Sequence, residues 1–283
     1  MELNSGLRML LQALVGPPTS LPQATLNDVI AKVPSTRLAE HSLISCDPEV
    51  RVRHARGQSL PDWLEMHSGD VNTFPDGVAM PESSEQVRML LDHAKANDIV
   101  VIPYGGGTSV VGHINPDKSE RAVLTIDMGK MNKLLHIDTE SQLATFGSGI
   151  AGPALEAALN GHGFTLGHFP QSWELSTLGG WVASRSSGQQ SIHYGRIENL
   201  FAGGSIETLA GTLDIPTIPA SSAGPDVREM ILGSEGRMGI ITEVTVRITP
   251  LPEKELFQVV FFPSWDVGIT VARELIQQRV ALS

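Results

Sequence analysis

Apolar and polar positions along the chain alternate with two periods, one typical of helices and the other of strands. In residues 84–97, apolar side chains from Val87 to Ala94 recur at the spacing of one helix face. Ser83 stands just before this stretch and has the spacing of a capping-box residue. The β-branched run 99–102 follows at once and predicts a short buried strand. A helix followed by a strand is therefore expected here.

The alternation of helices and β-rich stretches continues to the end of the chain. Residues 121–128 predict a strand, residues 133–149 a hairpin, and residues 153–163 a helix that ends at one of two glycines. Residues 256–283 predict a terminal strand followed by an amphipathic helix. Residues 1–45 predict a helical lead-in interrupted by prolines, and only residues 213–226 have the composition of a long loop.

Composition and charge narrow the classes of function. The 283 residues are 41% hydrophobic, enough for one large core or two moderate ones. The formal charge of −11 disfavours nucleic acid and anionic membranes, which are themselves polyanions. No stretch approaches the roughly 20 apolar residues of a membrane span, and the N-terminus lacks a basic signal-peptide region. We expect a cytoplasmic protein that acts on a small molecule.

The titratable side chains give no metal site and no obvious nucleophile. Cys46 is the only cysteine, so it has no internal disulfide partner, and the neighbouring Asp47 disfavours its thiolate. The nine histidines are scattered, and no pair has zinc-ligand spacing with a convincing third ligand. We expect no bound metal.

Residues 103–112, the glycine loop, read PYGGGTSVVG and carry the first candidate chemistry. A phosphate-binding P-loop requires a lysine that this loop lacks, and a Rossmann fingerprint requires a glycine where Val110 stands. The three glycines instead allow successive backbone N–H groups to face an anion, with the hydroxyls of Thr108 and Ser109 as further donors. The alternative is a purely structural turn.

Two later segments share this character. Residues 170–188 place six serine and threonine hydroxyls around Gly179 and Gly180, where the start of a helix would present free N–H groups. Residues 233–241 contain Glu235 between two glycines and lead into a predicted strand. Each segment alone is more often a solvated loop or turn, but the three together are far more specific.

These motifs resemble a known family. VIPYGGGTSVVG, GHFPQSWELSTLGGWVASRSSG, YGRIENL and AGPDVREMILGSEGRMGIITE match, in order and spacing, the vanillyl-alcohol oxidase family of FAD-linked oxidases with a PCMH-type domain. Within that family the chain is most similar to the alkyldihydroxyacetonephosphate synthases. The resemblance begins near Asp47 and covers more than four fifths of the chain.

The resemblance implies an FAD site built from three groups of residues. The glycine loop would wrap the pyrophosphate, the serine-rich segment would line the flavin and ribityl chain, and the last segment would close the site through its backbone. The implied residues are Pro103, Tyr104, Gly105, Gly106, Gly107, Thr108, Ser109, Gln171, Ser172, Trp173, Glu174, Leu175, Ser176, Thr177, Ser184, Arg185, Ser186, Ser187, Glu235, Gly236, Arg237, Met238, Gly239, Ile240 and Ile241.

The resemblance also bears on how the flavin is attached. Some relatives carry a covalent flavin on a histidine of the glycine loop, about where Thr108 stands, and a hydroxyl cannot form that bond. We therefore expect non-covalent FAD, with a flavin contact of His113 as a minor alternative to a solvated side chain. Gln171 replaces a usual aspartate and Arg237 a usual threonine of the synthases. These two departures weaken the synthase assignment more than the FAD assignment.

The implied fold is α+β, with two α/β lobes that clasp an extended FAD. We expect a helical lead-in over 1–60, a PCMH-type FAD-binding domain over 61–252, and the beginning of a truncated substrate or cap domain over 253–283. The catalytic residues would lie in that cap. Among local candidates are His168, Tyr194 and Arg185, and Arg185 would either place charge near the flavin or pair with a carboxylate.

The implied functions belong to two classes. The first is an FAD-dependent enzyme that exchanges the acyl group of an acyl dihydroxyacetone phosphate for a fatty alcohol, or that oxidises a D-2-hydroxy acid. The second is a non-catalytic flavin-binding module, completed by a partner chain. A homodimer, or a partner that supplies the cap, is compatible with both.

Overall fold

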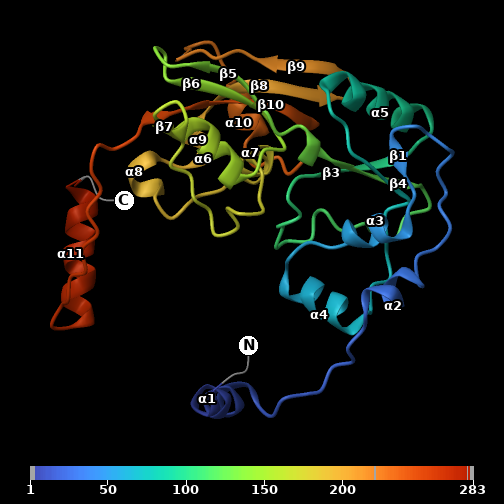
Figure 1. The fold of residues 1–283 in the computed structure, drawn as a ribbon, viewed down its shortest axis with the longest axis horizontal. Coiled ribbons are helices and arrows are strands. Elements are labelled where there is room, and N and C mark those ends of the chain that lie inside the picture. Colours follow the sequence, from blue (N-terminus) through green and yellow to red (C-terminus); the bar gives the residue numbers. More distant parts are fainter. Residues whose placement is uncertain (1–3, 220, 279, 281–283) are drawn as a thin grey trace.

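The computed structural model describes residues 4–219, 221–278 and 280. Residues 1–3 of the expected lead-in, residue 220 of the 213–226 loop, and residues 279 and 281–283 of the terminal segment therefore lie outside the described residues. Two β-sheets lie side by side, each with its own helices, and form two lobes (Figure 1). The fold is α+β with one mixed and one antiparallel main sheet, as the sequence predicts.

The first lobe is built on a four-stranded sheet. Its strands have the order β1-β2-β4-β3, and both β2 and β3 run parallel to β4. The elements are β1 (Ile44–Ser45), α3 (Pro48–Arg53), β2 (Gly77–Ala79), α5 (Ser84–Ala96), β3 (Val100–Tyr104) and β4 (Val123–Asp127). The predicted helix at 84–97 is confirmed: Ser83 caps α5, and the face from Val87 to Ala94 is buried. The strand after it is also present as β3, but its residues are half-buried rather than buried.

The second lobe is built on a five-stranded antiparallel sheet in the order β5-β6-β10-β8-β9. Its strands are β5 (Leu134–Asp138), β6 (Leu143–Gly147), β8 (Phe201–Thr208), β9 (Gly211–Ile215) and β10 (Ile240–Arg247). Its helices are α6 (Gly152–Asn160), α7 (Leu178–Ser184), α8 (Ser191–Tyr194), α9 (Ile197–Leu200) and α10 (Val227–Ile231). The predicted hairpin at 133–149 is the β5–β6 pair. Phe146 of this hairpin and Trp181 of α7 belong to the same buried hydrophobic cluster.

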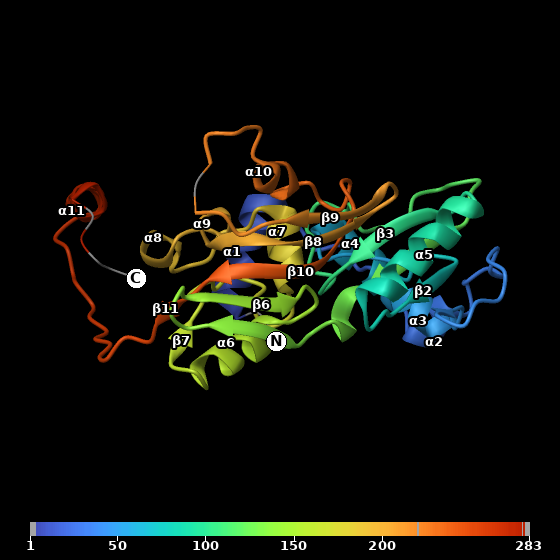
Figure 2. The same cartoon turned by 90° about the horizontal axis from the view of Figure 1, so that it is seen from above.

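The two lobes share packed contacts. A single-turn 3-10 helix, η1 (Met128–Lys130), leads from β4 into the second lobe. Ile240, the first residue of β10, is buried in the hydrophobic cluster of the first lobe. α5 packs against β8 and β10, beside one end of the second lobe's sheet (Figure 2). The space between the lobes therefore has walls that are fixed with respect to each other.

The ends of the described chain pack less tightly. α1 (Ser5–Val15) and α2 (Leu26–Ile30) form the expected lead-in, α4 (Leu60–Ser68) follows α3, and a small sheet pairs β7 (Phe164–Thr165) with β11 (Thr249–Pro250). α11 (Trp265–Gln277) has no buried residue among those described, and it stands apart from the lobes (Figure 1).

The terminal strand expected within 256–283 is wrong. Residues 256–262 form no described strand, and the side chains of Phe257 and Phe261 are about nine-tenths exposed. A β-rich run becomes a strand only when another strand completes its hydrogen bonds, and no described strand lies beside this one. No described helix is long and apolar enough to cross a membrane.

Candidate functional site

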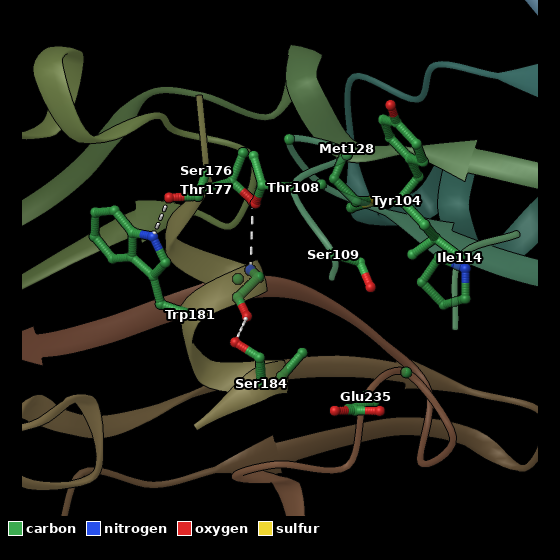
Figure 3. A pocket seen from close by; sticks show the side chains of 18 of the residues that line it. Tyr104, Thr108, Ser109, Ile114, Met128, Ser176, Thr177, Trp181, Ser184 and Glu235 are labelled. Atoms are coloured by element: carbon green, nitrogen blue, oxygen red, sulfur yellow. Dashed lines mark hydrogen bonds between the residues drawn. The ribbon is translucent and has the colours of Figure 1, made fainter. Parts of the chain in front are cut away.

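A cavity of about 360 Å³ lies between the lobes, within the usual size range of small-molecule pockets. Its wall comes from the glycine loop after β3, the segment around α7, and the loop before β10. Figure 3 shows Ser109, Thr177 and Glu235, one residue from each segment, around this space. The structure thus brings together the three segments that the sequence singles out.

A separate physical constraint requires glycine at each of the three consecutive positions 105, 106 and 107 of the glycine loop. A side chain on residue 105 would place its Cβ 2.5 Å from the Thr177 Oγ1 atom, and one on residue 106 would overlap the Leu175 carbonyl. Gly107 has φ of 68°, the left-handed region that other residues adopt at a cost. The loop therefore approaches the α7 segment backbone to backbone.

A polar cluster lies behind the glycine loop. The Tyr104 ring begins the loop and lies 4.6 Å, centroid to centroid, from the imidazole of His54. The His54 Nε2 atom is 2.9 Å from a carboxylate oxygen of Asp127, the last residue of β4. Burial, followed by the charge of Asp127, raises the pKa of the Tyr104 phenol to about 12. The Tyr104 side chain is therefore a neutral, protonated phenol at neutral pH.

Hydroxyl groups surround the first turn of α7. Thr177 caps the helix and accepts a hydrogen bond from the Gly180 N–H, with 3.3 Å between nitrogen and oxygen (Figure 3). Ser184 Oγ donates to the Gly180 carbonyl at 2.8 Å, and the buried Trp181 indole donates to Ser176 Oγ at 2.7 Å. The Trp181 bond fixes the segment against the core, so the hydroxyls and glycine backbone that line the cavity are preorganised.

The cavity has little charge. Of the histidine, aspartate, glutamate, lysine and arginine residues that the structure describes, only His113 and Glu235 line it. The His113 Nδ1 atom is 3.0 Å from Ser109 Oγ and 3.6 Å from a Glu235 carboxylate oxygen. An anionic ligand here would be held by backbone N–H groups and hydroxyls rather than by a cation.

Sequence reasoning missed several lining residues, of which Ser148 is the most informative. Its side-chain oxygen is buried and has no hydrogen-bond partner among the described residues. It follows β6 between Gly147 and Gly149, and the backbone of Gly179 packs against it. The Gly-Ser-Gly pattern at the end of a strand repeats the composition of the other segments and is the signal that could have found it. Val110, Val111, Ile114, Met128 and Trp181 also line the cavity.

Most of the residues implied by the resemblance line the cavity. They are Pro103, Tyr104, Gly105, Gly106, Gly107, Thr108, Ser109, Ser172, Ser176, Thr177, Ser184, Ser186, Glu235, Gly236, Gly239, Ile240 and Ile241. Gln171, Trp173, Glu174 and Leu175 line a second cavity that shares Pro170 and Ser172 with the first. Arg185, Ser187, Arg237 and Met238 line neither.

The three local candidates for chemistry differ in their surroundings. The Arg185 guanidinium lies 2.9 Å from a Glu229 oxygen and 3.7 Å from a Glu198 oxygen, so it pairs with carboxylates. His168 is fully buried, with its Nε2 atom 2.8 Å from Ser186 Oγ, and burial lowers its pKa to about 4. Burial also raises the pKa of Tyr194, whose ring covers Gly167. None of the three lines either cavity.

No group of three or more metal-ligating side chains occurs in the part of the chain that the structure describes. The donors around the cavity are hydroxyls and amide N–H groups, which suit phosphate and ribityl oxygens. The lining therefore offers hydrogen-bond donors of the kind that bind phosphate and hydroxyl-rich ligands.

Comparison with known proteins gives consistent results. Residues 75–213 match a family described as FAD binding domain. Over 267 residues the chain is 37% identical to an alkyldihydroxyacetonephosphate synthase of Caenorhabditis elegans, and the aligned region makes up 91% of this chain and 45% of that protein. It is also 37% identical to an uncharacterized FAD-linked oxidoreductase of Escherichia coli (strain K12), covering 78% and 45% respectively.

A solved structure of alkyldihydroxyacetonephosphate synthase superposes with a TM-score of 0.84 at 32% sequence identity. The superposition covers 97% of this chain and 53% of that one. The chain thus spans about half the length of the proteins it matches.

Proposed function

Because the chain belongs to the FAD binding domain family, we propose that it holds one FAD, without a covalent bond, in the cavity between its lobes. The observation that carries this proposal is the backbone approach of the glycine loop to Thr177 and Leu175, which leaves N–H groups and hydroxyls around a cavity without cations. A diphosphate can be held in this way by a nest of backbone amides. The orphaned hydroxyl of Ser148 supplies one more unused donor at the same place.

The lining residues support non-covalent attachment. The residue at the position implied for a flavin bond is Thr108, and its hydroxyl is not a nucleophile of the required kind. His113 is the only histidine that lines either cavity, and its Nδ1 atom already contacts Ser109 and Glu235. A ring held by two polar partners is better suited to close the cavity than to bond the flavin.

We further propose that the natural protein is an FAD-dependent enzyme of the alkyldihydroxyacetonephosphate synthase type. Bound FAD would supply the redox or adduct chemistry of its N5 atom. The described residues of this chain would bind and orient the cofactor. Substrate groups would come from a part that covers the apolar run around Phe257 and Phe261, because side chains this exposed are typical of an interface.

The first test is the visible absorption spectrum of the purified chain, before and after acid precipitation. Flavin bands near about 370 and 450 nm that acid releases into the supernatant would support a non-covalent FAD site. Flavin that stays in the pellet would contradict the non-covalent attachment. A colourless chain that also takes up no added FAD would contradict the proposal as a whole.

A second test separates the reactions. FAD-loaded protein is incubated with an acyl dihydroxyacetone phosphate and a fatty alcohol, and separately with a D-2-hydroxy acid and a redox dye. Ether product supports the synthase assignment, and dye reduction supports the oxidase alternative. Absence of both in protein that retains FAD favours a flavin-binding module completed by another chain.

A further inference from the structure

The imidazole of His54 lies between two oxygens that can only accept hydrogen bonds. Its Nδ1 atom is 2.8 Å from the Val50 carbonyl oxygen, and its Nε2 atom is 2.9 Å from a carboxylate oxygen of Asp127. Neutral imidazole has a single N–H group and can satisfy only one of these acceptors. The imidazolium form satisfies both, so the geometry around His54 is that of a protonated ring.

The environment of His54 agrees with this geometry. Burial opposes the charge, but the hydrogen bonds to Asp127 and Val50 and the charge of Asp127 outweigh it, so the pKa of His54 is raised above its ordinary value. The groups that face the ring are the Asp127 carboxylate, the Val50 carbonyl and the Tyr104 ring. When the proton leaves, Asp127 keeps an uncompensated negative charge with little access to water, since its side chain is 16% exposed.

This pair lies directly behind the glycine loop. The Tyr104 ring packs against His54 at a tilt of 54°, and a Cβ atom on Gly107 would overlap the phenol oxygen of Tyr104. The lining of the cavity offers no lysine or arginine, so its electrostatic potential depends on the few charged groups near it. A change of one charge unit at the His54–Asp127 pair therefore changes the electrostatic energy of an anion bound in the glycine loop.

We propose that His54 is a positioning residue for the cofactor: its protonated form neutralises Asp127 behind the glycine loop and so favours binding of the FAD diphosphate. This inference rests on the proposed FAD site and adds a dependence on pH. FAD affinity is high below the pH at which His54 loses its proton and falls as the pH rises through that point. By linkage, bound FAD also raises the pKa of His54.

The test measures the dissociation constant of FAD between about pH 6 and about pH 8.5, by quenching of flavin fluorescence. His113 also lines the cavity, so all variants carry His113→Gln, which leaves no imidazole among the described lining residues. Far-ultraviolet circular dichroism at each pH verifies that the chain remains folded. In this background we expect the affinity to fall about fivefold over the range, from one charge unit acting through partly screened space.

Three substitutions decide the outcome. His54→Arg keeps the positive charge at every pH and should abolish most of the pH dependence. His54→Gln should show weak affinity throughout. Asp127→Asn removes the charge that deprotonation would expose, keeps an oxygen for the Gly129 N–H, and should retain high affinity at about pH 8.5.

Two results would overturn the inference. One is an unchanged pH dependence in both His54→Arg and Asp127→Asn, and the other is full affinity of His54→Gln at low pH. If the chain without any substitution binds no FAD at any pH, the proposed cofactor site itself fails, and this inference fails with it.

Discussion

The phenol oxygen of Tyr104 lies at the position that a Cβ atom on Gly107 would occupy. Gly107 is also held at φ of 68°, so two independent constraints exclude a side chain there. The turn of the glycine loop therefore packs against the Tyr104 ring, which in turn contacts the His54 imidazole at a tilted angle.

Gly107→Ala should impair cofactor binding more than it impairs stability. The left-handed conformation costs a non-glycine residue about 1–2 kcal/mol, and the Tyr104 ring must also move, which displaces the loop from the cavity. Gly163→Ala is the matched control, because Gly163 has φ of 82° but nothing within 4 Å of its would-be Cβ. Urea unfolding should show a loss of stability in both variants, whereas titration with FAD should show weak binding only in Gly107→Ala. Equal FAD affinity in the two variants would contradict this role of the loop.

Ser148→Ala should weaken FAD binding without destabilising the free protein. The Ser148 hydroxyl is buried and unpartnered among the described residues, so its removal costs no hydrogen bond in the absence of ligand. If the hydroxyl bonds the cofactor, its loss should lower the affinity about five- to tenfold. Thr125→Val is the control, since the Thr125 hydroxyl is also buried and unpartnered there but does not line the cavity. Isothermal titration with FAD measures both, and an unchanged affinity of Ser148→Ala would exclude the contact.

His168 should make the fold sensitive to acid. Its pKa is lowered to about 4 by burial, from 6.5 in an exposed histidine, so the unfolded chain binds a proton that the folded chain does not. The contribution of neutral His168 to the free energy of unfolding is fully present above about pH 6.5. It falls as the pH drops toward 4, by about 2 kcal/mol between pH 7.5 and 5. Urea unfolding at the two pH values should show this slope, and His168→Gln should reduce it. The control is His162→Gln, since His162 is exposed. An unchanged slope in His168→Gln would assign the acid sensitivity to other groups.

Local patterns explain most of what could be predicted from the sequence. The helix at α5 follows from the apolar face between Val87 and Ala94, and the turn after β3 follows from three consecutive glycines. These signals lie within a few residues of one another, so turn chemistry and periodicity are sufficient. The two-lobed fold was instead implied by the resemblance to a known family, which the motifs along the whole chain carry.

Contacts between distant parts of the chain could not be predicted in this way. His54 and Asp127 are 73 positions apart, and neither belongs to a motif that the sequence analysis singled out. Ser148 lines the cavity because β6 ends beside Gly179, a tertiary contact that the local Gly-Ser-Gly pattern does not specify by itself. The incorrect prediction of a strand within 256–283 arose from a local signal without a tertiary contact. Residues such as Phe257 and Phe261 favour a strand but have no described partner strand.

The contact between α5 and β8 should stabilise both the fold and the cavity between the lobes. Arg88 lies 3.2 Å from a carboxylate oxygen of Glu207, whose side chain is only 4% exposed, and it also donates to the Thr208 carbonyl. Arg88→Met would leave this buried carboxylate without its cation, which we expect to cost about 2 kcal/mol of unfolding free energy.

The control for this prediction is Arg53→Met. Arg53 and Glu49 form an exposed pair at 2.6 Å within α3, and its loss should cost less than about 0.5 kcal/mol. Because α5 belongs to one lobe and β8 to the other, Arg88→Met should also loosen the cavity and lower FAD affinity, whereas Arg53→Met should not. Urea unfolding and FAD titration of the same two proteins test both effects. Equal behaviour of the two variants would mean that apolar packing, such as that of Ile240, holds the lobes together without the Arg88–Glu207 pair.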